Sequence, residues 1–374
     1  MIPSRHLVAT KPELGFGYMR LPQVNGKFDF NAVNEMVDAF LSHGFTYFDT
    51  AYMYPGAEEA LRESLVKRHD RSQYEIATKL FISNLVNPTQ QKEQFETSLV
   101  RLGVDYIDFY LLHDLTGRNM KKSYDFDTWG FLQRLKAQGL VKHIGFSFHG
   151  TAEELDEVLS RQSEMELVYL QINYLDWDDG KIQSRQCYEV ARKHKIPIFV
   201  MEPTKGGLLA GNESASATFL RQANADASIA SWAFRYAGGL EGVALVLSGM
   251  GTLSQIEDNA KTFKQFRPLS KDERAKITEA IEIISSVKRV PCTGCGYCVP
   301  HCPQEIWIPQ IIEDYNELLV HRALDTLKFK YAITTLGAKG AKMDRCTKCR
   351  LCEEHCPQHI KVPDILQAMS DQLM

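Results

Sequence analysis

The chain has 374 residues, of which 44% are hydrophobic and 24% are charged, as is typical of a globular protein with a substantial core. A net charge of −4 gives no reason to expect nucleic acid or an anionic membrane as a partner. Residues 1–17 lack the apolar stretch of a signal peptide, and no apolar run is long enough to cross a bilayer. The sequence therefore predicts a soluble protein of the cytoplasm.

Between about residue 14 and residue 265, short apolar runs alternate with longer amphipathic segments. This alternation is typical of parallel strands joined by crossover helices. The runs, in chain order, are LGFGYMR, TYFDT, YEIATKL, IDFYLLH, HIGFSF, LVYLQIN, IPIFVME and VALVLSG. Eight strands in about 250 residues predict an α/β fold of the (β/α)8 barrel type. An open doubly wound sheet is the alternative, but no GxGxxG motif opens the first unit.

Local helix signals support this interpretation. Gly44 suits the C-terminal end of the first helix, and the pairs Thr151–Glu154 and Ser270–Glu273 have the spacing of a capping box. Apolar residues recur at helical spacing in the first helix: Val33, Met36, Val37, Phe40 and Leu41.

The C-terminal part of the chain contains an internal repeat. The segment RPLSKDE marks the end of the barrel, so we expect a barrel over 1–266, a connecting helix over 267–287 and a further domain over 288–374. In that domain CPQEIWIPQI at 302–311 matches CPQHIKVPDI at 356–365. The stretch between the copies has apolar residues at helical spacing: Ile311, Ile312, Tyr315, Leu318 and Leu319. This domain is therefore predicted to be a small α-helical domain.

Nine cysteines in a chain without a secretion signal favour thiolate chemistry over disulfides. One of them, Cys187, lies in the helical-looking segment IQSRQCYEVARKH and is predicted to be a small buried side chain. The other eight form two runs of the pattern C-x2-C-x2-C-x3-C-P: Cys292, Cys295, Cys298, Cys302 and Cys346, Cys349, Cys352, Cys356. Three thiolates within seven residues can bind three irons of one cubane, whereas the fourth points away from it.

Residues 288–374 resemble the two-[4Fe–4S] ferredoxin family, in which the fourth cysteine of each run ligates the other cluster. We therefore expect Cys356 to join the first three cysteines of the first run, and Cys302 to join those of the second. Two zinc sites of four cysteines each are an alternative, but they leave the third cysteine of each run without a role. Disulfides across two intervening residues are of little use as cross-links in a reducing compartment.

Positive charge surrounds the second cysteine run. Only Asp344 opposes a set of five basic residues: Lys339, Lys342, Arg345, Lys348 and Arg350. One interpretation is an ordinary solvated face. The other is a docking patch for an acidic carrier such as ferredoxin or flavodoxin, or a means of stabilising the reduced cluster.

Three ionisable residues lie at the ends of three successive apolar runs: Asp49, Lys79 and His113. A fourth, Tyr54, follows in the loop AYMYPG. The C-terminal ends of barrel strands converge on the active-site face, so these four residues are expected to meet there. Taken singly, each has a structural explanation, since an aspartate can cap a helix, a lysine can extend to solvent and a tyrosine can pack.

Together these residues fit one chemistry. A free tyrosine has a pKa of about 10, which is too high for an efficient general acid near neutrality. The Lys79 ammonium would lower the pKa of Tyr54, and Asp49 would keep that ammonium charged. With His113 bonded to the oxygen being reduced, the set suits proton donation to a carbonyl while a nicotinamide supplies hydride.

The segments GFTYFDTAYMYPGAEEALRESL, ATKL, YLLHDL and LSGMGTLSQIEDN resemble the aldo-keto reductase family, and the whole chain is similar to members with a C-terminal ferredoxin-like extension. The resemblance implies a tetrad of Asp49, Tyr54, Lys79 and His113, with Tyr54 as acid/base, and NADP or NAD as cofactor. It implies these cofactor contacts: Gly17, Tyr18, Met19 and Arg20 near the nicotinamide; Ser147 and Gln171 at its carboxamide; Lys205 and Gly206 at the pyrophosphate; Asp258 and Asn259 near the adenine; and also Met201, Pro203, Ser248, Gly249, Met250 and Gln255.

Three departures from the family pattern affect the cofactor. Ser147 is followed by Phe148 where many members have asparagine, and Met201 stands where many stack a tyrosine on the nicotinamide. The segment 248–260 contains no arginine or lysine, although NADP-specific members usually bind the 2′-phosphate with such residues there. Lys261, which follows the segment, would only partly substitute for them. We therefore expect appreciable use of NADH.

The sequence thus predicts an NAD(P)H-dependent oxidoreductase that acts on a small carbonyl or alcohol and carries two [4Fe–4S] clusters. One alternative is an electron-transfer or redox-sensing module whose barrel binds nucleotide as a signal; another is a structural role for the clusters. Nicotinamide delivers two electrons as hydride whereas a cluster takes one, and no flavin motif links them, so we expect the clusters to serve an external protein partner.

Overall fold

The computed structural model describes residues 4–7, 11–24, 26–211, 214–286, 289–321 and 343–373. The chain forms two compact units. The first, here called the barrel unit, comprises Met1–Thr204 and Asn224–Arg274; the second, the cysteine unit, comprises Lys205–Ala223 and Ala275–Met374. The boundary expected after residue 266 places 205–223 in the barrel, whereas in the structure this segment groups with the C-terminal part.

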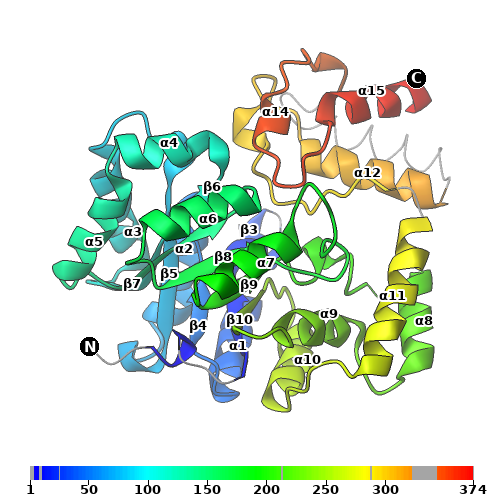
Figure 1. Ribbon diagram of the computed structural model, residues 1–374, viewed down its shortest axis with the longest axis horizontal. Coiled ribbons are helices and arrows are strands. Elements are labelled where there is room, and N and C mark those ends of the chain that lie inside the picture. The colour runs from blue at the N-terminus through cyan, green and yellow to red at the C-terminus, as the bar shows by residue number, and fades with distance from the viewer. Residues whose placement is uncertain are drawn as a thin grey trace. The chain divides into compact units, whose positions relative to one another are not determined.

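The barrel unit is built around eight parallel strands that close in the order β1-β10-β9-β8-β7-β6-β5-β4 (Figure 1). Each strand coincides with one of the apolar runs, so the prediction of a (β/α)8 barrel is confirmed. The barrel strands are β1 (Glu13–Gly17), β4 (Tyr47–Asp49), β5 (Glu75–Phe81), β6 (Ile107–Leu115), β7 (Val141–Phe148), β8 (Leu167–Gln171), β9 (Ile198–Met201) and β10 (Val243–Ser248). After β1, the short strands β2 (Gln23–Val24) and β3 (Lys27–Phe28) form an antiparallel ribbon.

Large apolar side chains fill the inside of the barrel. Among them are Tyr47, Phe109, Tyr169, Phe199 and Leu245, which pack together and are almost completely buried. Side chains alternate between the two faces of a strand, so the residue two positions further along also points inward. This alternation places polar residues above an apolar floor at the C-terminal ends of the strands.

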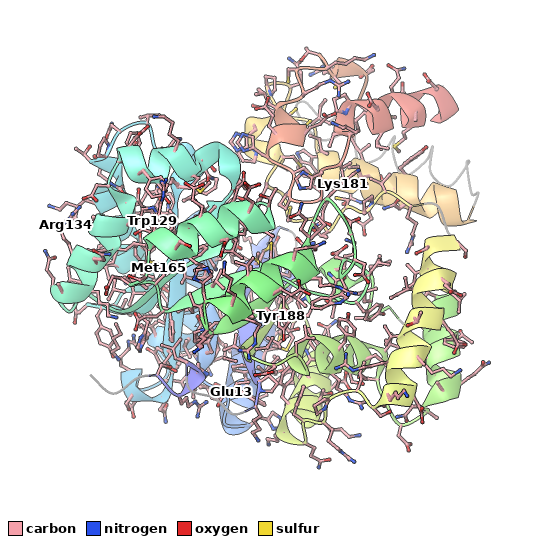
Figure 2. All side chains as sticks on the ribbon, viewed as in Figure 1. Glu13, Trp129, Arg134, Met165, Lys181 and Tyr188 are labelled. Atoms are coloured by element: carbon pink, nitrogen blue, oxygen red, sulfur yellow. The ribbon has the colours of Figure 1, made fainter. Side chains whose placement is uncertain are left out.

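Helices cover the outside of the barrel, and their apolar faces pack on the outward side chains of the strands (Figure 1). They are α1 (Phe30–Ser42), α2 (Ala57–Leu61), α3 (Gln90–Leu102), α4 (Gly117–Asp125), α5 (Thr128–Ala137), α6 (Ala152–Arg161), α7 (Ser184–Lys193), α9 (Ile229–Gly238) and α10 (Leu253–Lys264), with the π-helical turn η3 (Arg62–Val66) after α2. Trp129 of α5, labelled in Figure 2, packs edge-on against Phe146 of β7 with ring centroids 5.7 Å apart.

The predicted helix ends form as expected. Glu154 Oε2 accepts from Thr151 N at 2.8 Å while Thr151 Oγ1 accepts from Glu154 N, which is the capping box that opens α6. Ser270 and Glu273 exchange the same pair of bonds at the start of α11 (Lys271–Ser286). Gly44 follows α1 with a φ of 84°, a conformation that favours glycine.

A buried histidine lies at the opposite end of the barrel, where the strands begin. His6 is fully buried, with its Nδ1 2.8 Å from Glu13 of β1 and its Nε2 2.7 Å from Glu75 of β5; Glu13 is labelled in Figure 2. Burial opposes charge on the imidazole, but the hydrogen bonds and charges of the two carboxylates outweigh it and raise the pKa of His6 above 6.5. The N-terminal segment is thereby tied to two strands.

The cysteine unit is helical, as predicted for its C-terminal part, and has its own apolar core. Its helices include α8 (Ala215–Ala223), α12 (Ile308–His321), α14 (Leu351–Glu354) and α15 (Val362–Leu373), with the single turns η7 (Val299–His301) and η8 (Met343–Arg345). The first part of the helix expected between the repeats is α12; the rest of it, 322–337, lies outside the described residues. Among the residues that the structure describes, no helix combines the length and apolar character needed to traverse a bilayer.

Candidate active site and cysteine-lined cavities

Each of the eight barrel strands brings one residue singled out in the sequence to the same rim. In strand order from β1 to β10 the set is Gly17, Asp49, Lys79, His113, Ser147, Gln171, Met201 and Ser248. Five of these are the last residue of their strand, and the other three lie within two residues of its end. Strand pairing sets Gly17 opposite Asp49 and Gln171 opposite Met201. The closed barrel thus assembles one site from the whole length of the unit.

Lys79 lies at the centre of the polar contacts on this rim. Its Nζ donates to Asp49 Oδ1 and to the backbone oxygen of Thr50, each at 2.7 Å. Lys79 is 2% exposed and Asp49 is 5% exposed, so the ion pair is shielded from water. The ammonium is therefore held in one position by groups on β4 and the loop that follows it.

The Tyr54 ring lies against both Lys79 and His113. The Lys79 Nζ is 5.5 Å from the centroid of the Tyr54 ring, and the His113 ring meets that ring edge-on with centroids 5.6 Å apart. The loop that carries Tyr54 is fastened from outside, because Arg101 donates to the backbone oxygen of Tyr52 at 3.1 Å. The structure therefore brings all four predicted residues together, with Tyr54 half-buried at the mouth.

Burial sets the charge of these groups. It raises the pKa of Asp49 and lowers the pKa of Lys79, while the charge of each partner acts in the opposite direction. The pKa of His113 is held well below its usual range, first by burial and then by the neighbouring Lys79 charge. The His113 imidazole is therefore neutral and can hydrogen-bond an oxygen without adding charge to the site.

Two tyrosines that sequence reasoning missed support the ion pair from below. The Tyr169 hydroxyl donates to Asp49 Oδ2 at 2.9 Å, and the Tyr47 and Tyr169 hydroxyls are 2.6 Å apart. Both are buried, and burial raises the pKa of each well above 10. The signal was present, because Tyr47 precedes Asp49, and Tyr169 precedes Gln171, by the two positions that share a strand face.

The two residues expected at a nicotinamide carboxamide are both fixed by neighbours. Ser147 Oγ accepts from the backbone nitrogen of Asp114 at 2.9 Å. Gln171 donates through Nε2 to Asp176 Oδ2 at 2.8 Å, and Asn173 donates to the same oxygen at 2.7 Å. The orientation of the Gln171 amide is thus set by a buried carboxylate that the sequence analysis did not identify.

Arg20 lies beside the segment that follows β10. A Cβ on Gly249 would come within 3.2 Å of Arg20 Cδ, and one on Gly251 within 3.4 Å of the Arg20 backbone oxygen. In the same segment Gln255 accepts from Gly251 N at 2.7 Å, close to the first residue of α10. Tertiary structure therefore brings a cation to a segment that has none in its own sequence.

The remaining expected cofactor residues divide by burial. Asn259 is buried and donates to Ser248 Oγ at 3.1 Å, whereas Asp258 is half-buried on the same helix. Tyr18 and Met250 are 1% exposed in the layer between strands and helices, where the Tyr18 hydroxyl is 2.9 Å from Ser64 Oγ. Met19 is half-buried, and Pro203 is buried just after β9. The Asp258 and Met19 side chains are thus partly exposed, whereas the Tyr18 side chain packs inside the barrel unit.

Two cavities in the cysteine unit are each lined by four cysteines. The first, here called cavity I, is lined by three residues of one run and the last of the other: Cys292, Cys295, Cys298 and Cys356. The second, cavity II, has the complementary set: Cys302, Cys346, Cys349 and Cys352. Both are otherwise mainly apolar, and Ile308 lines both.

The two cysteine runs also touch through their histidines. His301 and His355 each precede the last cysteine of a run, and their rings stack with centroids 3.5 Å apart and an angle of 8°. The basic patch near cavity II is partly neutralised, because Arg350 pairs with Glu353 at 2.9 Å and with Asp364 at 3.4 Å. Of its other members, Lys339 and Lys342 lie outside the described residues.

A closed (β/α)8 barrel with a buried Asp–Lys pair beside a tyrosine and a neutral histidine defines the first unit. This chain belongs to the aldo/keto reductase family, whose model matches residues 13–282. The model of a 4Fe-4S dicluster domain matches residues 291–361, C-terminal to it.

Two relatives are similar to this chain over about half of its length. Aldo-keto reductase str7 of Strobilurus tenacellus is 30% identical over 213 residues, or 53% of this chain and 60% of that protein. A glyoxal reductase of Bacillus subtilis is 29% identical over 210 residues, or 54% of this chain and 67% of that protein. This chain thus covers about three fifths to two thirds of the length of these relatives.

Solved structures share the barrel. An aldo-keto reductase from Bacillus halodurans in its holo form is 25% identical, with a TM-score of 0.58 over 72% of this chain and 91% of that chain. An aldo/keto reductase from Klebsiella pneumoniae, solved in complex with NADP and acetate, has a TM-score of 0.58 at 20% identity over the same shares. The second likeness concerns the fold alone.

Proposed function

We propose that the protein is an NAD(P)H-dependent oxidoreductase that reduces an aldehyde or ketone, or oxidises the corresponding alcohol, with Tyr54 as general acid or base. The observation that carries this proposal is the position of the Lys79 ammonium, which is bound to buried Asp49 at 2.7 Å and lies 5.5 Å from the Tyr54 ring centroid. A carbonyl-reducing site needs such a proton donor beside the hydride donor.

A nicotinamide, when bound, would supply hydride to the carbonyl carbon. The chain supplies the proton, which leaves the Tyr54 hydroxyl for the carbonyl oxygen as the C=O bond becomes an alcohol. The positive charge of Lys79 favours the tyrosinate that remains, and Asp49 and Tyr169 fix that charge. The neutral His113 hydrogen-bonds the oxygen as negative charge develops on it. In alcohol oxidation Tyr54 takes the proton instead.

The cofactor is proposed to be NADP or NAD, held at the rim by the residues that the family resemblance implies. Gln171 and Ser147 suit the carboxamide because their own partners fix their orientation, and Arg20 supplies positive charge beside residues 249–251. The NADP complex of the Klebsiella relative supports this choice by analogy of fold.

Two [4Fe–4S] clusters are proposed for the cysteine unit, with residues 288–374 as the ferredoxin-like domain that holds them. Four cysteines around an otherwise apolar space suit a cubane, and the exchanged last cysteines are those expected of a dicluster domain. When bound, such clusters supply one-electron transfer. An acidic ferredoxin or flavodoxin is the proposed partner, because Cys349 is exposed beside Arg350. The thiolate sites favour a reducing compartment, the cytoplasm.

The decisive experiment is replacement of Tyr54 by phenylalanine in the cluster-loaded protein, with glyoxal as the first test substrate because one relative is a glyoxal reductase. Carbonyl reduction should fall by about 10²–10⁴-fold while nucleotide binding changes little. Turnover that survives the change would exclude the acid role of Tyr54. Nucleotide binding without any carbonyl reduction by the unaltered protein would favour the second candidate, a redox-sensing module whose barrel binds nucleotide and whose clusters serve a partner.

A further inference from the structure

The two cysteine-lined cavities have different surroundings, although the repeat that forms them is nearly symmetric. Gln304 and Gln358 occupy equivalent places in the repeat, two residues after Cys302 and Cys356, and each lines one cavity. Gln304 is half-buried, whereas Gln358 is 7% exposed. The two glutamines also differ in their contacts, because Gln358 meets Lys205, which lies far away in the sequence.

Lys205 reaches cavity I through Gln358. Its Nζ donates to Gln358 Oε1 at 3.0 Å, and Lys205 itself is only 5% exposed. With its oxygen engaged by the lysine, the donor end of the Gln358 amide is fixed in the wall of a cavity lined by four cysteines. A cluster bound by four thiolates carries negative charge, so a cation bonded to the wall of its cavity interacts with it favourably.

The loop that carries Lys205 is pressed against the same wall. Lys205, Gly206 and Gly207 have φ angles of 47°, 65° and 99°, and the first of these costs free energy because lysine has a Cβ. A Cβ on Gly206 would lie 2.6 Å from the backbone oxygen of Thr293, the residue after Cys292. The loop therefore has room only for glycine at this point, and its unfavourable conformation is held in place by the cysteine unit.

We propose that Lys205, acting through Gln358, raises the reduction potential of the cluster in cavity I. The physical reason is electrostatic. Reduction adds one negative charge to the cluster, which a nearby cation stabilises and a nearby anion opposes.

The test is a redox titration of the cluster-loaded full chain, followed by electron paramagnetic resonance. Lys205→Met should reduce the ratio of reduced to oxidised cluster by about tenfold at a fixed potential, for one of the two clusters only. For a one-electron couple this change equals a reduction potential lower by about 59 mV. Gln358→Leu should shift the same cluster in the same direction without altering the loop, and Lys205→Arg should retain the wild-type value. The matched change Gln304→Leu should leave that cluster unchanged.

Unchanged potentials in both Lys205→Met and Gln358→Leu would overturn the link between Lys205 and the cluster. A potential shift of equal size in Gln304→Leu would likewise count against it, because that change leaves the Lys205–Gln358 contact in place.

Discussion

Replacing Lys79 by methionine, alone and together with Asp49→Asn, separates the catalytic role of the lysine from its contribution to stability. Lys79 and Asp49 are 2% and 5% exposed and share a 2.7 Å contact. The single change leaves the Asp49 carboxylate buried, with the Tyr169 hydroxyl on its Oδ2. The double change removes both charges and keeps a carbonyl oxygen that can accept from Tyr169.

The magnitudes follow from this burial. Removing one partner of a buried ion pair costs about 3–5 kcal/mol, so Lys79→Met should lower the free energy of unfolding by about 3 kcal/mol at neutral pH. Burial already raises the pKa of Asp49 above 3.8, and loss of the lysine raises it further. The folded state then favours the protonated acid, so the defect should be small below pH 3.8 and grow as pH rises through the pKa of the folded state. The double variant should regain most of the lost stability.

The single and the double variant should differ in stability but not in turnover. Both variants lack the cation beside Tyr54, so each should lose about 10²–10⁴-fold in carbonyl reduction. The measurements are denaturant unfolding with intact clusters and steady-state oxidation of NADPH. A double variant that recovers turnover along with stability would refute the argument, because the charge of Lys79 would then matter only for folding. Lys79→Arg serves as a charge-retaining control.

Three further outcomes are expected. His6→Asn should lower the melting temperature most below pH 6.5 and less as pH rises. The pKa of His6 is higher in the folded state than in the unfolded state, so its charge stabilises the fold fully below the unfolded-state pKa, and this stabilisation is lost as pH rises through the folded-state pKa. NADH and NADPH should bind within about tenfold of each other, and Arg20→Ala should weaken NADPH about tenfold more than NADH. Cys356→Ala should abolish the same cluster signal as Cys292→Ala, whereas Cys187→Ala should leave the signals of both clusters unchanged.

Each of these outcomes can fail in a recognisable way. A stability loss at His6 that is independent of pH would mean that the residue only fills space. Equal weakening of both nucleotides by the Arg20 change would place that residue away from the 2′-phosphate. If Cys356→Ala removed the signal that Cys346→Ala removes, the exchange of last cysteines between cavities would be wrong. Cys187 is a suitable control because it is 5% exposed and burial raises its pKa to about 12.

The sequence by itself determined the architecture, because the signals for it are local. Buried runs of strand length, helical spacing before Gly44 and capping boxes at Thr151 and Ser270 each depend on residues within one or two turns of each other. The tetrad could also be found from the sequence, since three of its members lie at or within two residues of the ends of successive strands, which a barrel must bring to one rim. The spacing of the cysteines is a local signal too, so the sequence also indicated the dicluster domain.

Tertiary structure alone decided which distant groups support these sites. Tyr169 and Asp49 are 120 positions apart, and Lys205 and Gln358 are 153 apart. Strand alternation places Tyr169 on the inner face of its strand, but only barrel closure pairs it with Asp49. The pairing of Lys205 with Gln358 depends on how one loop packs on the cysteine repeat. The same holds for Arg20 beside Gly249. Local patterns fix where a side chain lies on its own element, but only packing between elements fixes what it meets.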